Sequence, residues 1–351
     1  MIQIIPLADR DRWSMNVDRA NIYQTWEYAY ATAAGHGASP EQAVLVPAPA
    51  ELGPADPKDS EVSPGVFRVS PPQPTLAELN DPQLLVGEVD GHRFTFPFVS
   101  EVRDGRMQAS SIYGYAGVAF DGDRVVGVDV VRDQIKKALS EAGFAKAFIR
   151  WGAEHRTSKF FSGDVDFSAP VRMIPLMDGP EAAFAGPECA THRSQVARGK
   201  KAGIVAVIQS APDYVDLMKF RDMYVRTMDR VGADEKYFFS EEYFARLADL
   251  GHRLVLIKTS KSRALFLAGS GPGPTAYYHL SAREPDAHNT EIHVLFDAAA
   301  KWALDQGMTD ICLGGGKTGA EDDSLYLFKS RIGRGLAKAE FTELNCTQEA
   351  K

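Results

Sequence analysis

Hydrophobic and polar positions follow the same order of predicted elements in the two halves of this chain. In the first half, residues 84–98 predict a strand, an Asp-Gly turn and a second strand. The aromatic stretch 111–120 predicts a third, short strand. Residues 130–143 have the helical period and end at a glycine, and the apolar stretch 145–152 predicts a fourth strand.

The second half repeats this order. Residues 253–269 predict two strands joined by a turn, and residues 275–282 predict a short aromatic strand. An amphipathic helix over 291–307 and a strand over 309–316 follow. The helix has apolar residues at spacings of three and four: Ile292, Leu295, Phe296, Ala299 and Trp302. Strand, strand, strand, helix, strand therefore occurs twice, which is typical of an internal repeat although the residues themselves differ.

The repeat predicts an α/β (α+β) fold of two tandem units, 1–175 and 176–351. Each unit is expected to be a mixed, mostly antiparallel sheet flanked by helices. Between the repeats, a basic helix is expected over 191–203, with Thr191 as N-cap and Gly203 after its end. Other expected elements are a helix over 24–34, strands over 171–176 and 204–210, helices near 213–231 and 240–250, and a Pro-rich surface loop or lid over 47–82.

Composition bounds the class of protein. The chain has 351 residues, of which 44% are apolar and 25% charged, enough for two folded cores. We find no apolar run long enough to span a bilayer, and the three cysteines are far apart in the sequence. We therefore expect a cytoplasmic protein without a membrane span, and with neither a metal site nor a bound cofactor.

The net charge of −8 does not favour a nucleic-acid partner, but two acid-free stretches are basic. The first lies between Glu188 and Asp213, and the second between Asp323 and Glu340. Two solvated helix faces would explain these stretches equally well. The basic residues of the first stretch that we consider as phosphate contacts are Arg193, Arg198, Lys200 and Lys201.

A glycine-rich motif, LGGGKT, covers residues 313–318 and ends in the letters of a phosphate-binding loop. That loop requires a glycine at position 311, which is Ile311. Gly314, Gly315 and Gly316 nevertheless follow a predicted buried strand, which indicates that something approaches the backbone closely. Their amides could face an acyl or phosphate group, or they could form a tight turn beside another strand.

The next segment, 321–333, predicts a short helix with Asp323 as its N-cap. Leu325, Phe328 and Ile332 would form its buried face, and Lys329 would project off that face. Lys329 is either an ordinary surface lysine or, because it follows a glycine-rich loop, a functional cation.

Tyr113 and Tyr115 flank Gly114 in the expected third strand, and Gly117 follows two positions later. Alternate residues of a strand share a face, so the two aromatics would line either a cleft or a core edge. The histidines show no HExxH spacing, and the chain has no GxSxG motif.

The element order matches the core of the GNAT acetyltransferase superfamily, twice over. The segments QTWEYAY, IYGYAGVAF, HRSQVARGKKAG, MYVRTMDRVGADEKYFFSEEYF, YYHLSA and LGGGKTGAEDDSLYLFKSRIG resemble those of the Fem-like acyltransferases, which are double-GNAT proteins. Members of known activity move an aminoacyl group from aminoacyl-tRNA to an amine in a cell-wall precursor or a small natural product. The Pro-rich loop departs from this pattern and leaves the acceptor site open.

The resemblance implies roles for particular residues. Phe328 and Lys329 match a Phe-Lys pair beside the reacting carbonyl, where the lysine stabilises developing negative charge. The segment with Tyr113, Gly114, Tyr115 and Gly117 matches one beside the acceptor cleft, and the helix from Arg193 to Lys201 matches a basic helix that we assign to tRNA. Further expected substrate contacts are Tyr278, His279, Gly314, Gly315, Gly316 and Asp323.

Three hypotheses follow. The first is transfer from aminoacyl-tRNA to a small-molecule or cell-envelope amine. The second is an acyl-CoA-dependent N-acyltransferase acting on an amino sugar or another amine. The nearest match to its pyrophosphate motif, Arg124 to Asp129, ends in an acid, which favours tRNA. The third is a non-catalytic binding module. A substrate group, Asp322, Asp323 or His279 could act as general base.

Overall fold

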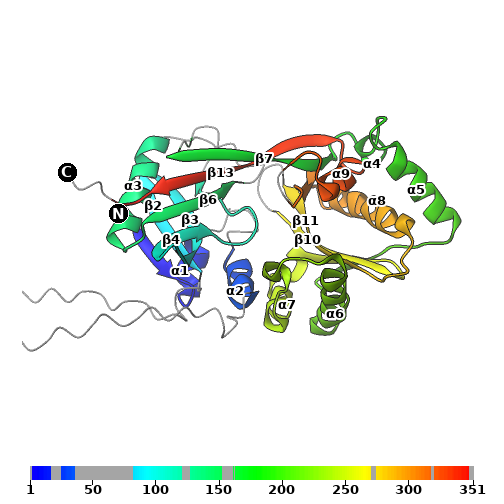
Figure 1. Cartoon of the computed structure of the whole chain (residues 1–351), viewed down its shortest axis with the longest axis horizontal. Helices are drawn as coiled ribbons and strands as arrows, with labels where there is room; N and C mark the ends of the chain where they lie inside the picture. The colour runs from blue at the N-terminus through cyan, green and yellow to red at the C-terminus, as the bar shows by residue number, and fades with distance from the viewer. Residues whose placement is uncertain are drawn as a thin grey trace, which may run out of the picture.

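The structure is a computed structural model that describes residues 2–16, 25–35, 82–120, 127–151, 161, 163–269, 274–317 and 320–347. Its strands form one 13-stranded sheet, in the order β1-β2-β3-β4-β6-β13-β7-β12-β11-β10-β9-β8, with β5 paired to β3 (Figure 1). The Pro-rich loop expected at 47–82 lies outside the described residues, apart from Pro82.

The strands, in chain order, are β1 Gln3–Pro6, β2 Gln83–Val89, β3 His92–Arg103, β4 Arg106–Ser111, β5 Ala119–Phe120, β6 Lys146–Trp151, β7 Val165–Pro175, β8 Val207–Ser210, β9 Leu254–Lys258, β10 Ser262–Ala268, β11 Thr275–Arg283, β12 Asp310–Gly314 and β13 Gly335–Asn345. The helices are α1 Arg10–Asn16, α2 Trp26–Gly35, α3 Val128–Glu141, α4 Pro180–Ala183, α5 Ala190–Lys201, α6 Tyr214–Val231, α7 Glu241–Leu247, α8 Asn289–Asp305 and α9 Ser324–Ser330. Short 3₁₀ turns cover Glu235–Tyr237 and Ala248–Arg253.

The sheet contains the expected repeat. In the first unit β2 pairs with β3 and β3 with β4, both antiparallel, and helix α3 then crosses to β6, which is parallel to β4. In the second unit β9, β10, β11, α8 and β12 have the same arrangement, with β12 parallel to β11. The fold is thus two tandem α/β units in a mixed, mostly antiparallel sheet.

The units exchange their last strands. β7 follows β6 along the chain but pairs with β12 of the second unit, and β13 follows β12 but pairs with β6 of the first. β7 and β13 also pair with each other, antiparallel, from Gly335–Met173 to Glu343–Val165. Figure 1 shows these two long strands side by side across the length of the molecule. The exchange closes the gap between the units with backbone hydrogen bonds.

Three apolar clusters stabilise the sheet. One lies under α3 and contains Phe98, Ile135 and Leu344, so the C-terminal strand completes the core of the first unit. A second lies under α8 and contains Phe266 and Phe296. The third covers the opposite face of the sheet and joins both units through α2, α6 and α7. This shared cluster and the exchanged strands position the units relative to each other.

The expected third strand of the first unit was placed wrongly. It is β4, Arg106–Ser111, and not 111–120; residues 113–115 form a turn. Gly114 and Gly117 have φ values of 102° and 53°, which a strand does not contain. β4 escaped prediction because its buried residues include Gln108, Ser110 and Ser111, so no apolar alternation marks it. A second Asp-Gly turn, at Asp104 and Gly105, was the available signal.

We predict that the two units unfold together. Leu344→Ala removes a fully buried side chain of β13 from the first unit's core and should cost about 2–5 kcal/mol. Urea unfolding curves from tryptophan fluorescence and circular dichroism should coincide and shift together. Leu336→Ala, on the same strand but 69% exposed, is the control and should change stability by less than about 0.5 kcal/mol. Two separate transitions would contradict the prediction.

Candidate functional site

The glycine loop after β12 is fastened to the start of α9. The Asp323 carboxylate accepts from the backbone N–H groups of Leu325 and Tyr326, at 2.9 and 3.1 Å, and is the N-cap that the sequence predicted. Its second oxygen accepts from the Lys317 N–H at 2.9 Å. A Cβ added at Gly316 would lie 2.6 Å from this carboxyl group, so the glycine permits the loop to approach the helix.

Lys329 is buried, which corrects the expectation that it projects off the buried face of its helix. The face of α9 that packs inward carries Tyr326 and Lys329, whereas Leu325 and Phe328 are half-buried. The Lys329 side chain is 8% exposed, and its Nζ donates to the Gly315 carbonyl at 2.7 Å. Burial lowers the pKa of Lys329 to about 8, because the charged form loses water.

Tyr115 reaches the same point from the first unit. Its loop is fastened to β6: the Arg150 N–H donates to Ser111 Oγ at 2.9 Å, and the Gly117 N–H donates to the Arg150 carbonyl at 2.9 Å. A Cβ built at Gly314 would lie 3.4 Å from both Tyr115 Oη and Lys329 Nζ. A hydroxyl and an ammonium from different units therefore converge on one backbone position.

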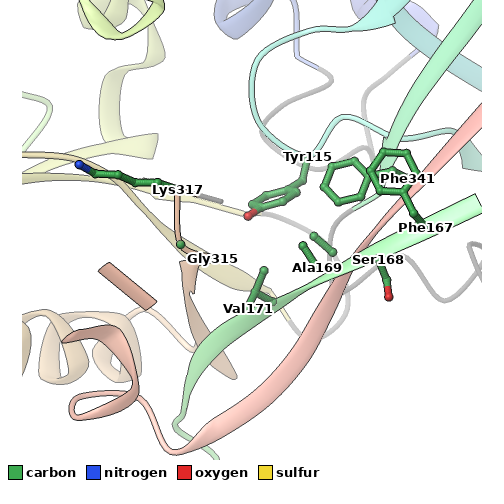
Figure 2. A pocket seen from close by; sticks show the side chains of 10 residues that line it. Tyr115, Phe167, Ser168, Ala169, Val171, Gly315, Lys317 and Phe341 are labelled. Carbon is green, nitrogen blue, oxygen red and sulfur yellow. The ribbon is translucent and has the colours of Figure 1, made fainter. Parts of the chain in front are cut away.

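A groove of about 400 Å³ opens beside this point. β7 and β13 form one wall, and Tyr115 and the glycine loop form the others (Figure 2). Figure 2 shows Lys317 pointing away from the aromatic side chains that line the groove. The lining residues are Tyr115, Phe167, Ser168, Ala169, Val171, Gly315, Gly316, Lys317, Ala339 and Phe341.

The two units differ where their parallel strands end. In the second unit, the β11–β12 pairing stops at Tyr277 and Cys312. In the first, the β4–β6 pairing stops at Ser110, and the Tyr115 loop then bonds across to Arg150. A β-bulge in β11 adds a further difference. Leu280 pairs with Leu265 of β10 and Tyr278 with Phe266, so His279 is an extra residue without a pairing partner in β10. The second unit therefore has the opening, and the first unit fills its own.

The other expected substrate contacts divide around the sheet. Tyr278 packs against Phe296 and lies 6.0 Å from Lys329 Nζ, measured to its ring centre. Tyr113 packs against Phe239 and His279 in the shared apolar cluster. Phe328 packs on the second unit's core, 6.3 Å from the His293 ring. Tyr278 thus lies near Lys329, Phe328 packs on the second unit's core, and Tyr113 faces the joint between the units.

His279 and Asp323 are already engaged and make weak candidates for a general base. The Nε2 of His279 is hydrogen-bonded to the Tyr243 hydroxyl at 2.6 Å, and burial lowers its pKa to about 3. Asp323 accepts three backbone N–H groups. Asp322 is exposed, in the turn before α9.

The basic helix forms as α5, but its side chains differ in availability. It begins after Cys189 and not at a Thr191 cap, and Gly203 follows its end with a left-handed φ of 74°. Arg193 donates to the carbonyls of Phe184 and Gly186, and Lys200 pairs with Asp297 at 2.9 Å. Within the described residues, Arg198 and Lys201 have no carboxylate within 4 Å and are exposed.

The helices that follow the third strand of each unit begin with acids. Gly127 precedes α3, and Asp129 lies in the first turn of that helix. In α8 the first-turn Glu291 is buried, and its carboxylate accepts from Thr259, Ser260 and the Lys261 N–H at 2.6, 3.0 and 2.8 Å. Each helix N-terminus therefore already has negative charge close by.

The described residues contain neither a metal-binding cluster nor a membrane-spanning helix. No group of three or more His, Cys, Asp or Glu side chains among them is arranged to hold a metal ion. No helix in the described ranges combines the length and apolar character needed to cross a membrane.

The groove walls were missed from sequence. β13 was not predicted, and only residues 171–176 of β7 were. The signal in β13 is a weak alternation of Ala337, Ala339 and Phe341 with charged residues, which is too poor in large apolar side chains to stand out.

Known structures share this fold. FemX superposes with a TM-score of 0.52 at 13% identity, over 74% of this chain and 87% of that one. L-PGS from Bacillus licheniformis superposes with a TM-score of 0.52 at 16% identity, over 78% of this chain and 87% of that one. A conserved protein of unknown function from Bacteroides thetaiotaomicron superposes with a TM-score of 0.53 at 11% identity, over 98% of this chain and 100% of that one. No protein-family model and no curated protein sequence matches the chain. The chain therefore shares its fold with FemX and L-PGS.

We predict that Lys329 lowers stability at neutral pH. Reducing its pKa from 10.5 to about 8 corresponds to about 3 kcal/mol against the charged native form, partly offset by the bond to Gly315. Lys329→Met should therefore raise the free energy of unfolding by about 2 kcal/mol at pH 7.

The pH dependence tests the cause. Between about pH 8 and 10.5 the native state has released this proton and the unfolded state still holds it, so wild-type stability rises with pH. The difference in the free energy of unfolding between Lys329→Met and wild type should therefore decrease over that pH range, as measured by urea titrations. An advantage that is absent at pH 7, or constant up to pH 10.5, would contradict the prediction.

Proposed function

We propose that this protein is an N-acyltransferase that moves an aminoacyl group from aminoacyl-tRNA to the amine of a small molecule or cell-envelope precursor. The observation that carries the proposal is the buried Lys329 ammonium beside Gly314, which is hydrogen-bonded to Gly315 in the lining of a groove that both units share. The tandem fold shared with FemX supports it.

The chemistry of the transfer explains a buried cation. An amine attacks the ester carbonyl of the donor, the carbonyl oxygen gains negative charge, and the tRNA hydroxyl leaves. Donors fixed in a water-poor site stabilise such an oxyanion strongly, because they need no reorganisation. Lys329 Nζ is held by the Gly315 carbonyl and has further N–H groups to offer, and Tyr115 Oη is a second donor near Gly314.

The proton of the attacking amine requires a base. His279 and Asp323 are both engaged in the hydrogen bonds described above. The proposal therefore assigns the proton to a phosphate or carboxylate of the bound substrates.

The acidic helix starts support tRNA over acyl-CoA as donor. A pyrophosphate would need free amides at a helix N-terminus without competing negative charge. Asp129 lies in the first turn of α3, and the buried Glu291 lies in the first turn of α8. Both positions disfavour a pyrophosphate.

The buried lysine also argues against a non-catalytic binding module. An uncharged side chain at this position would make a more stable protein, because the loss of water around the ammonium outweighs its attraction to the Asp323 carboxylate. Stability given up at one position is typical of functional sites.

Lys329→Ala tests the catalytic role. If Lys329 meets the oxyanion only in the transition state, kcat and kcat/KM should fall equally, by about 100-fold. Single-turnover transfer from charged tRNA to an amine acceptor is the measurement. Lys338→Ala, an exposed lysine on β13, is the control and should keep full activity. Lys329→Arg keeps the charge but not the compact ammonium, and should restore little in so closed a site. Full turnover by Lys329→Ala would refute the assignment.

Charged-tRNA binding tests the donor. Affinity should fall with salt, with a log–log slope of about −0.7 to −0.9 for each phosphate that a cation neutralises. The double variant Arg198→Ala, Lys201→Ala should make the slope shallower by about 1.5. Arg106→Ala with Lys137→Ala, two exposed cations of the first unit, is the matched control. Saturable binding of acyl-CoA without binding of tRNA would overturn the choice of donor.

A further inference from the structure

Three phenylalanines form an apolar strip on the face of the sheet where β6, β13 and β7 run together. Phe167 and Phe341 are directly opposite in the β7–β13 pairing, with ring centres 4.8 Å apart and planes within 12°. Phe148 on β6 stacks on Phe341 at 5.9 Å and on Phe167 at 6.2 Å. Stacking fixes the rings without burying them, and Phe167 remains 48% exposed.

The strip continues into the groove of the candidate site. Phe167 and Phe341 line both, and beyond them the wall consists of Ala169, Ala339 and Val171. Large rings are thus followed by small side chains along the groove wall, and Tyr115 and the glycine loop form the rest of the lining. An exposed apolar surface that leads into a groove is characteristic of a ligand site and not of ordinary solvent-facing sheet.

Charged side chains border both the strip and the groove. Glu343, which is opposite Phe148 in the β6–β13 pairing, pairs with Lys146 at 3.9 Å and is not part of the groove lining. The groove lining contains one charged residue, Lys317, and no carboxylate. Arg150 borders the strip: it is directly opposite Phe341 in the β6–β13 pairing, and its guanidinium lies 5.9 Å from the Phe148 ring centre. Within the described residues, neither Lys317 nor Arg150 has a carboxylate within 4 Å, and the Arg150 guanidinium donates to the Gly114 carbonyl at 3.4 Å.

We propose that the groove binds the acceptor, and that the acceptor is an α-amino acid with an aromatic or large aliphatic side chain. The side chain would lie on Phe167 and Phe341, the carboxylate would be taken by Arg150, and the amine would point to Gly314, where Lys329 and Tyr115 meet. The role of the amino acid as acceptor rests on the proposed transferase activity, whereas its binding in the groove does not depend on that activity.

The same features disfavour other acceptors. A polyamine would find no carboxylate in the lining to hold its ammonium groups. A nucleotide-linked sugar would bring two phosphates to a groove of about 400 Å³ whose lining holds one cation. A single ring with a carboxylate matches both the volume and the charge.

Calorimetric titration of the full chain with L-phenylalanine tests the site. L-Alanine lacks the ring and L-phenylalaninamide lacks the carboxylate, and each should bind about tenfold more weakly than L-phenylalanine. Phe167→Ser should weaken L-phenylalanine binding about tenfold and leave L-alanine unaffected. Leu336→Ser is the control, since this 69% exposed leucine of β13 lies outside the groove lining, and it should bind as wild type. Phe167 is half exposed, so its variant should fold, which circular dichroism checks.

Equal binding of L-alanine, or of L-phenylalanine by Phe167→Ser, would refute the side-chain site. Equal binding of the amide would refute the role of Arg150. The result of the binding titration can be distinguished from the result of the transferase assay. Groove binding of L-phenylalanine without any acyl transfer would overturn the proposed function alone, and transfer to ring-free amines only would overturn this inference alone.

Discussion

The antiparallel pairing of β7 with β13 is the constraint on which the rest of the structure depends. Strands β6 and β12 each have an outer edge that needs a partner strand. β6 pairs with β13 and β12 pairs with β7, so each partner comes from the other half of the chain. Because the exchanged strands then pair with each other, the units share one sheet and one groove wall. The site can therefore draw Tyr115 from one unit and Lys329 from the other without relying on a loose interface between domains.

The repeat could be predicted from sequence because it depends on local patterns. Helix α8, its glycine end and the strands around it follow hydrophobic periods that are visible in the residues alone. The strand exchange could not, because no local pattern records which distant edge β13 pairs with. Asp323 was predictable as a helix N-cap, because an N-cap side chain bonds to backbone N–H groups only two or three residues along the chain. The burial of Lys329 was not, because it depends on a carbonyl fourteen positions away and on α9 packing with its lysine inward.

The two units show how a duplicated fold becomes specialised. Both keep the crossover from the third strand through a helix to a parallel strand. The first unit uses its own loop to close the gap beyond that parallel pair, and so becomes a support that presents Tyr115. The second has a bulge at His279, and its helix α9 carries the desolvated cation Lys329. Within the described residues, the buried histidine, glutamate and lysine side chains all lie in the second unit: His192, Glu291, His293 and Lys329.

The strand exchange has a consequence for how the protein is made. About 160 residues separate the end of β7 at Pro175 from the start of β13 at Gly335. At roughly 5–20 residues per second, a ribosome needs about 8–30 s to produce that interval. During this time β6 lacks β13, β7 lacks both of its partner strands, and the aromatic side chains of the first unit face an incomplete sheet. The nascent chain therefore exposes unpaired strand edges for many seconds, which raises its tendency to pair with other chains.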